Sequence, residues 1–302
     1  ARPTRGQIVR AYVALTKPRI IELLLITTVP AMILAAHGMP PLTLIAWTLL
    51  GGSLAAGSAN AINQYLDRDI DALMTRTRRR PLPAHAVTPE NALVFGFALG
   101  VIAFAELTLL VNLLAAFLAL LAIGFYVVVY TMLLKRTTPQ NIVIGGAAGA
   151  LPPVIGVAAV TGDITLPALL LFAIVFYWTP PHFWALALRL TKDYRAAGVP
   201  MLPVVKGVPE TTRQIALHTC VMVALTLVFF AVAHMGAIYL TAALVLGGIF
   251  IWRAAMLWRQ ATSPEASLAQ AIRLYRYSIA YLTLLFVAVA VDTLVVIRVP
   301  LG

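Results

Sequence analysis

The chain has 302 residues, of which 61% are hydrophobic and 11% are charged, and its formal net charge is +11 at pH 7. An ordinary soluble domain has about 45–50% apolar and about 25% charged residues, so this composition excludes that class, and it also excludes a disordered chain. The positive charge alone would suit a nucleic-acid-binding protein, but the positions of the basic residues indicate another use.

Nine apolar stretches are long enough to cross a bilayer, because about 20 apolar residues span its hydrocarbon core. In chain order they cover roughly 20–37, 42–66, 91–109, 113–134, 140–160, 165–190, 211–234, 236–258 and 275–297. They predict an all-α polytopic membrane protein with nine transmembrane helices, in which residues 1–302 form a single integral-membrane domain. The basic N-terminal segment leads directly into a full-length stretch, so no cleavable signal is expected.

The basic residues fall almost entirely on one side of the predicted membrane. Of the 22 lysines and arginines, 21 precede the first stretch or lie around alternate connections, and Arg298 alone lies on the other side. Because basic loops resist translocation, the side with the excess is predicted to be cytoplasmic. The N-terminus is then cytoplasmic, the C-terminus is outside after nine crossings, and no nucleic-acid partner is expected.

Two of the cytoplasmic connections, about 67–90 and 191–210, are long, whereas the outward connections are short. These two loops contain most of the polar sequence, so we expect the chemistry at the cytoplasmic face. Asp292 lies near the outer end of the last stretch and is expected to be solvated.

The first long loop follows three polar residues with helical spacing. Asn63, Asp67 and Asp71 are four residues apart, so on a helix they form one stripe. Two carboxylates at this spacing repel each other, and a divalent cation would remove the repulsion. Magnesium prefers one or two carboxylates together with waters and substrate phosphates. The alternative is a solvated helix end whose charges Arg68 neutralises.

Basic and acidic residues near both long loops complete the candidate site. Arg76 and Arg80, also four residues apart, would offer planar donors to phosphates. The second loop places Asp193 upstream of the turn Pro200-Met-Leu-Pro203, as Asp71 precedes a similar turn in the first loop. This parallel predicts two related halves whose polar loops meet over a shared cavity.

Two proline pairs, Pro152-Pro153 and Pro180-Pro181, are expected to kink or break their helices. His182 follows the second pair, in the inward half of the sixth stretch. Two interpretations of His182 are open: it binds a ligand, or it is a hydrogen-bonded histidine that stabilises the broken helix.

Several motifs together point to a known family. They are Leu15-Thr-Lys17-Pro-Arg19, Asp67-Arg-Asp-Ile-Asp71 with Arg76-Thr, Tyr130-Thr-x-x-Leu-Lys135-Arg136, Asn141-Ile-Val-Ile-Gly-Gly, Thr179-Pro-Pro-His182 and Lys192-Asp193-Tyr194. With them, the chain resembles the UbiA superfamily of intramembrane prenyltransferases from about residue 12 to 297, and within it the branch that acts on haem. Typical members have a second aspartate-rich motif, which here is reduced to Asp193, and this departure matches the haem branch.

The resemblance implies a UbiA-like bundle that transfers farnesyl from farnesyl diphosphate to a vinyl group of haem B with addition of water. It implies Mg²⁺ as cofactor, the lipid bilayer and these two substrates as partners, a bacterial cytoplasmic (inner) membrane location, and coupling to haem A synthase or terminal oxidase assembly. The implied metal ligands are Asn63, Asp67, Asp71 and Asp193, the implied diphosphate-binding residues are Lys17, Arg19, Arg76, Arg80, Lys135, Arg136 and Lys192, and His182 is the implied haem contact, through iron or a propionate. The catalytic set is Asn63, Asp67, Asp71, Arg76, Arg80, Lys135 and Asp193.

Two other functions stay open. A prenyltransferase of the same superfamily could use an aromatic quinone precursor as acceptor. A transporter would use the internal repeat and broken helices, but it should have polar residues near the bilayer midplane, and here the acidic clusters lie at the cytoplasmic ends.

Overall fold

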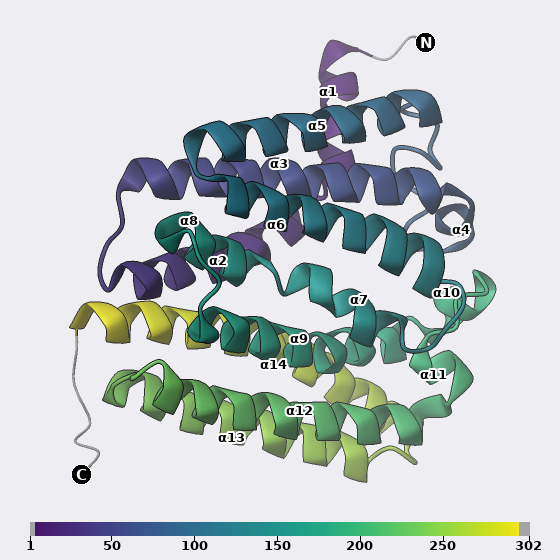
Figure 1. The fold of residues 1–302 in the computed structure, drawn as a ribbon. Coiled ribbons are helices and arrows are strands. Elements are labelled where there is room, and N and C mark those ends of the chain that lie inside the picture. Colours follow the sequence, from purple (N-terminus) through teal and green to yellow (C-terminus); the bar gives the residue numbers. More distant parts are fainter. Residues whose placement is uncertain (1–3, 296–302) are drawn as a thin grey trace.

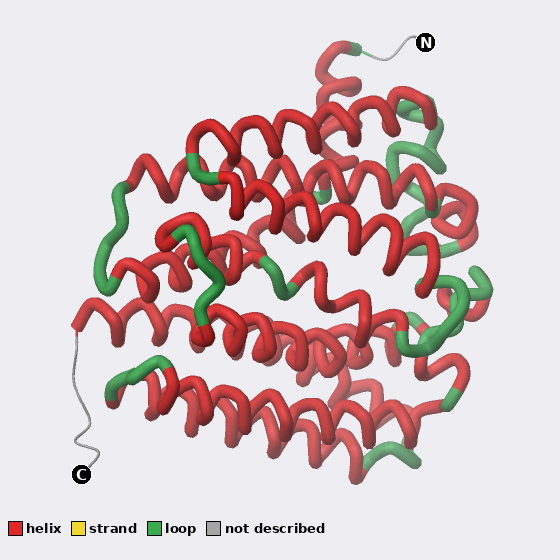
Figure 2. Tube along the Cα trace, in the orientation of Figure 1, coloured by secondary structure: helices red, strands yellow, loops and turns green. Residues whose placement is uncertain are grey.

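The computed structural model describes residues 4–295, without the side chains of residues 19–20, 22–25, 264 and 266. The described chain consists of helices joined by loops and turns, with no strand (Figure 2). The predicted all-α class is therefore confirmed. Arg298 and the end of the ninth predicted stretch lie outside the described residues.

The helices form one layered bundle (Figure 1). In chain order they are α1 Arg5–Thr16, α2 Pro18–Ala36, α3 Leu42–Leu66, α4 Arg68–Leu73, α5 Pro89–Leu110, α6 Leu113–Gly124, the π-helix η1 Phe125–Leu134, α7 Asn141–Gly149, α8 Pro152–Thr161, α9 Leu166–Arg189, α10 Thr191–Ala196, α11 Leu202–Val205, α12 Gly207–Val232, α13 Ala237–Arg259 and α14 Pro264–Val295.

The predicted spans correspond closely to these helices. Eight helical stretches in the described chain are long and apolar enough to cross a bilayer, and they match the second to ninth predictions. The first prediction corresponds to α2, whose described apolar stretch, Ile26–Ala36, is shorter than a full span. The protein is therefore a multi-pass membrane protein, and the count of nine crossings stays a prediction. The helices α1, α4, α10 and α11 were not predicted, and α14 begins before the expected position near 275.

The short helices α4, α10 and α11 gather at one end of the bundle, which we call the loop end (Figure 1). The last helix, α14, finishes at the opposite end (Figure 1). The two long loops meet at the loop end, as predicted: the backbone N–H of Arg76 donates to Asp193 Oδ2 at 3.3 Å. Beneath this contact, Ile70 and Met74 of the first loop pack in one apolar cluster with Tyr194 and Met201 of the second.

Small residues allow α3 and α5 to pack closely. A Cβ atom on Gly96 would lie 2.7 Å from the Ile62 side chain, and one on Gly100 would lie 2.8 Å from Ser58 Oγ. These distances are shorter than van der Waals contact, so a larger residue at either position would force a neighbouring side chain to move. Such close approach is typical of helix pairs in membranes, where van der Waals packing drives association.

The two proline pairs behave differently. The chain breaks at the first, since α7 ends at Gly149 and α8 begins at Pro152, which confirms that prediction. At Pro180 and Pro181 the helix α9 continues without a break, so of the predicted kink or break the break does not occur. Both prolines are buried, and α7, α12 and α14 pack against α9. Neighbouring helices of this kind let a membrane helix tolerate proline.

Asp292 is buried rather than solvated, contrary to expectation. Its Oδ2 accepts from the backbone N–H of Gly236 at 2.5 Å, and its Oδ1 accepts from that of Tyr239 at 3.0 Å. These two N–H groups lie at the N-terminus of α13, where the first turn has no intrahelical acceptors. The carboxylate of α14 therefore caps the neighbouring helix, a contact between residues 53 and 56 positions apart in sequence.

We expect Asp292→Ala to destabilise the protein by about 2 kcal/mol, because it removes a helix cap and leaves two buried N–H groups without acceptors. Asp292→Asn retains an acceptor and should cost less. Thermal and denaturant unfolding in detergent would measure both, with Asp163→Ala as the control, since Asp163 is an exposed aspartate in another connection. Equal unfolding midpoints for Asp292→Ala and the wild type would contradict the capping role.

Candidate active site

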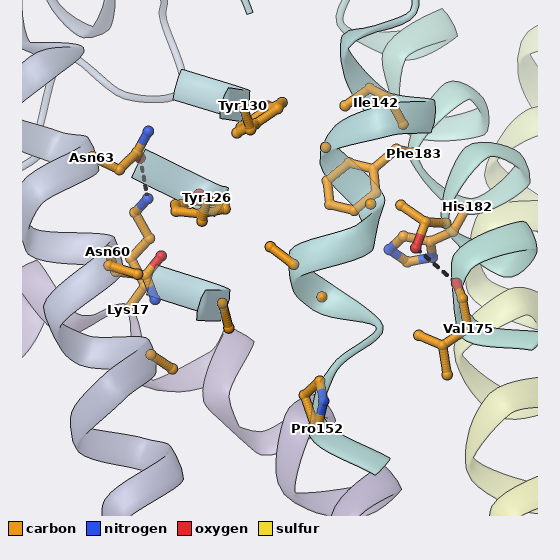
Figure 3. A pocket seen from close by; sticks show the side chains of 18 of the residues that line it. Lys17, Asn60, Asn63, Tyr126, Tyr130, Ile142, Pro152, Val175, His182 and Phe183 are labelled. Carbon is orange, nitrogen blue, oxygen red and sulfur yellow. Dashed lines mark hydrogen bonds between the residues drawn. The ribbon is translucent and has the colours of Figure 1, made fainter. Parts of the chain in front are cut away.

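A cavity of about 650 Å³ lies inside the bundle, between α3 and η1 on one side and α7 and α9 on the other (Figure 3). Its loop end is lined by charged and polar side chains, namely Lys17, Asn63, Asp71, Arg76, Arg80 and Lys135. Deeper in the bundle its walls are small and apolar, with Ala55, Ala56, Ala59, Gly145, Gly146 and Gly149 among them. The cavity can therefore hold a molecule with an anionic head and a lipophilic body.

Two fully buried aspartates stand at the charged end. Asp67 Oδ2 accepts from Asn63 Nδ2 at 2.7 Å and from Lys135 Nζ. Asp71 Oδ2 accepts from Arg80 Nη1 at 2.7 Å. Burial of a carboxylate is tolerated only with such partners, so each aspartate holds one basic side chain at the cavity.

The second oxygen of each aspartate accepts no hydrogen bond, although Arg136 Nη2 lies 3.8 Å from Asp67 Oδ1. Asp67 Oδ1 and Asp71 Oδ1 are buried without a hydrogen bond to any described residue. Two carboxylate oxygens with free lone pairs suit a hard cation such as Mg²⁺. The described residues contain no group of three His, Cys, Asp or Glu side chains that could hold a metal ion. A cation here would thus need ligands from substrate phosphates and water, which Mg²⁺ commonly uses.

Asn63 joins this network through both ends of its amide. Its Oδ1 accepts from Lys17 Nζ at 2.8 Å, as Figure 3 shows, and its Nδ2 donates to Asp67 and also to Thr131 Oγ1 at 3.1 Å. The oxygen that a metal would need is therefore held by Lys17. One lone pair of Asn63 Oδ1 is thus used by Lys17, and the second remains for a metal ion.

The position of Lys17 depends on the break between α1 and α2. Lys17 has a left-handed backbone, with φ 52°. Two amides of α3 hold the break: Asn60 Nδ2 donates to Thr16 O at 3.0 Å and Gln64 Nε2 donates to Leu15 O at 2.9 Å. Burial lowers the pKa of Lys17, and the nearby charges of Arg80 and Lys135 lower this pKa further. Sequence reasoning missed these two amides, although three amide side chains close together in an apolar stretch are a usable signal.

The π-helix η1 supplies the opposite lip of the charged end. Its wider turn is seen in the bond from Lys135 N to Tyr130 O, five residues back, at 2.8 Å. In an α-helix of about 100° per residue, Tyr126 and Lys135 would point in opposite directions. The π-helical turn instead brings Tyr126, Tyr130 and Lys135 to the same cavity wall. Sequence reasoning missed Tyr126, because on an α-helix this residue would face away from Lys135.

The other predicted residues, the buried Asp67 among them, are not part of the cavity lining. Arg136 forms a bidentate salt bridge with Asp69 on the outer side of α4. Its Nη1 donates to Asp69 Oδ2 and its Nη2 donates to Asp69 Oδ1, both at 2.7 Å. The hydrogen bond from Arg136 lowers the pKa of Asp69 to about 2. Lys192 is exposed on α10, and Asp193 is used in the contact between the two loops. The side chain of Arg19 lies outside the described residues.

His182 lies on the wall across the cavity from Asn63 and Lys17 (Figure 3). It is 7% exposed and its ring stacks on Trp178, with the ring centroids 4.3 Å apart. Tyr194, the neighbour of Asp193, also lines the cavity, from the second loop. The site therefore draws on both halves of the chain.

Comparisons with known proteins agree with this architecture. The model of the UbiA prenyltransferase family matches residues 24–279. Among curated proteins, the chain is 55% identical over 287 residues to "Protoheme IX farnesyltransferase" of Frankia alni. The aligned region covers 95% of this chain and 99% of that protein. Among solved structures, it is similar to a digeranylgeranylglyceryl phosphate synthase, with a TM-score of 0.77, 17% identity and coverage of 95% and 98%. A UbiA homologue from Archaeoglobus fulgidus bound to GPP and Mg²⁺ superposes with a TM-score of 0.63, 18% identity and coverage of 93% and 99%.

Proposed function

The chain belongs to the UbiA prenyltransferase family, and from this premise we propose that it transfers farnesyl from farnesyl diphosphate to a vinyl group of haem B with addition of water. That it is a prenyltransferase follows from the family. The observation that supports farnesyl transfer to haem B is the cavity, which has a cationic end and apolar walls. Curated relatives more than 50% identical over nearly the whole chain are named for transfer of farnesyl to protohaem.

The cationic end suits the diphosphate. Arg80, Lys135 and Lys17 converge on the cavity, and Arg76 also lines it, with no hydrogen bond or ion pair from its guanidinium to any described residue. Diphosphate becomes a good leaving group when its developing charge is neutralised, and preorganised cations in a partly dry site achieve this. We place Asp67 and Asp71 as holders of Mg²⁺ through their Oδ1 atoms, which accept no hydrogen bond, with the second lone pair of Asn63 Oδ1 as a further ligand. When bound, Mg²⁺ would add Lewis-acid neutralisation of the same charge, as the A. fulgidus homologue with GPP and Mg²⁺ suggests.

The apolar walls suit the rest of the reaction. The bond between C1 of farnesyl and the diphosphate oxygen breaks, and the diphosphate leaves with the electron pair. The vinyl group of haem then forms a bond to C1, and the cation beside the porphyrin is captured by water, which loses a proton. Bulk water would quench the allylic cation first, so alanine and glycine walls that exclude solvent favour transfer. The bacterial cytoplasmic membrane is the proposed location.

The proposed acceptor is tested with purified protein, farnesyl diphosphate, Mg²⁺ and haem B, followed by mass spectrometry. We expect an adduct of haem with farnesyl plus water. The same incubation with 4-hydroxybenzoate in place of haem is the control for a quinone-type acceptor. Prenylated hydroxybenzoate without a haem adduct would overturn the proposed acceptor while leaving prenyl transfer intact.

The lowered pKa of Lys17 predicts how substrate binding depends on pH. A diphosphate would stabilise the protonated amine and raise its pKa, so above the lowered pKa of the free protein, binding takes up a proton. Affinity for farnesyl thiodiphosphate should therefore fall as the pH rises above this lowered pKa toward the usual pKa of a lysine, by at most about tenfold per pH unit. Calorimetry in two buffers of different ionisation enthalpy measures this uptake.

The matched variant is Lys17→Met, in which the binding affinity should be weaker at pH 7 and the proton uptake should be lost. The wild type and Lys17→Met are compared at each pH, so titration of the ligand itself cancels. Equal proton uptake by both proteins would show that Lys17 is not the responsible group.

A further inference from the structure

The imidazole of His182 is held on three sides. Its ring lies against Trp178 at 4.3 Å and against Tyr275 at 4.8 Å between centroids, with interplanar angles of 21° and 32°. On its third side, Nδ1 is 2.7 Å from the hydroxyl of Ser278, a fully buried residue of α14. Trp178 fixes this serine from the backbone, since its Nε1 donates to Ser278 O at 2.8 Å.

The direction of the bond between His182 and Ser278 follows from counting hydrogens. A serine hydroxyl has one hydrogen to donate and two lone pairs. The Ser278 hydroxyl donates to Tyr275 O at 2.7 Å, the usual bond to a carbonyl one turn back in a helix. Toward His182 it can therefore only accept, and Nδ1 must carry the hydrogen.

The other ring nitrogen, Nε2, then carries no hydrogen and has a free lone pair. None of the residues in ring contact or hydrogen-bonded with His182 is charged, and a buried imidazolium without a partner would be costly, so the ring is neutral. A neutral imidazole with hydrogen on Nδ1 has an unprotonated Nε2. Among the described residues Nε2 has no hydrogen-bond partner, and His182 lines the cavity.

We infer that Ser278 is a positioning residue: it fixes His182 in the Nδ1–H tautomer and so presents the Nε2 lone pair to the cavity as a ligand for haem iron. This inference rests on the proposed acceptor. It also decides between two roles for His182, because a lone pair repels a propionate carboxylate and binds a metal. Hydrogen bonding of the second nitrogen sets the orientation of histidine ligands in many metal sites.

The tautomer is tested first, without haem. In protein labelled with ¹⁵N-histidine, the His182 signals are identified by their loss in His182→Gln, and the ¹⁵N shifts distinguish protonated from unprotonated ring nitrogens. We expect protonated Nδ1 and unprotonated Nε2 in the wild type, and a shift toward the other tautomer in Ser278→Ala. Ser278→Thr, which keeps the hydroxyl, should restore the wild-type pattern.

A matched control is Ser267→Ala, which removes another buried serine of α14 and should leave the His182 signals unchanged. If Ser278→Ala unfolds, Ser278→Cys is measured in its place, because a thiol is a weaker acceptor and should still shift the tautomer balance. A protonated Nε2 in the wild type, or identical spectra for the wild type and Ser278→Ala, would overturn the inference.

Iron ligation is tested by titrating ferric haem B and recording the Soret band and the electron paramagnetic resonance spectrum. We expect a nitrogen-ligated spectrum in the wild type, and in Ser278→Ala a haem affinity about 10- to 100-fold weaker. Ser267→Ala and Ser278→Thr should resemble the wild type. The KM for farnesyl diphosphate should be unchanged in Ser278→Ala, because the diphosphate end lies across the cavity.

The outcomes separate this inference from the proposed function. A wild-type protein that ligates haem through nitrogen, but forms no farnesylated haem, would refute the proposed reaction and support the role of Ser278. Farnesylation of haem with no nitrogen ligation, or with a haem spectrum unchanged in His182→Gln, would refute the ligand role alone.

Discussion

Asp71→Asn is expected to reduce prenyl transfer by about 10³-fold or more without unfolding the protein. The substitution preserves the shape of the side chain and an acceptor for Arg80, but it removes the negative charge of a carboxylate that lines the cavity and whose Oδ1 atom accepts no hydrogen bond. A neutral amide is a poor ligand for Mg²⁺ and cannot replace this charge. Product formation, measured by mass spectrometry at saturating Mg²⁺, would report the loss.

The same segment supplies a matched control. Asp69 lies two residues before Asp71 on α4, is largely exposed and pairs with Arg136 outside the cavity. Since surface ion pairs contribute little, Asp69→Asn should keep activity within about twofold of the wild type. Size-exclusion chromatography and thermal unfolding verify that both variants fold. Wild-type turnover by Asp71→Asn would remove the assignment of this carboxylate to the metal.

Lys135→Met is expected to abolish transfer and also to destabilise the fold, because Lys135 has two roles. Its ammonium lines the cavity and pairs with Asp67, which is fully buried. Removing one member of a buried ion pair leaves an uncompensated charge, at a cost of about 3–5 kcal/mol. A lower unfolding midpoint together with loss of product is the expected result.

A second substitution separates these roles. In Asp67→Asn/Lys135→Met both charges are absent, so most of the lost stability should return. Activity should not return, because neither the metal-binding carboxylate nor the cation for the diphosphate is present. Recovery of activity in the double variant would mean that the pair is structural, and recovery of neither would mean that Lys135 stabilises the fold through other contacts.

The bilayer made the architecture predictable from sequence. A span needs a run of about 20 apolar residues, so its ends are visible in composition alone, and the stretches 42–66 and 113–134 have the bounds of α3 and of α6 with η1. The Asp67 and Asp71 stripe was also visible, because helical spacing is local. The break at Pro152 was predictable for the same local reason.

The roles of individual side chains depended on contacts far apart in the chain. Asn63 was expected as a metal ligand, but its oxygen binds Lys17, 46 residues away. Arg136 was expected at the diphosphate, but it lies outside with Asp69, 67 residues away. A sequence motif indicates which residue types lie close together, but it does not show which of them are already hydrogen-bonded or ion-paired with other residues of the protein.

The sequence by itself determined that this is a membrane bundle, where its helices run, and that its polar chemistry lies at one end, since each follows from hydrophobicity and short-range spacing. Only the tertiary structure decided which side chains face the cavity. A π-turn places Lys135 beside Tyr126, and helix packing sets Ser278 against His182 across 96 residues. Helix type and packing are fixed by the sum of many long-range contacts, and a pattern read along one segment does not contain that sum.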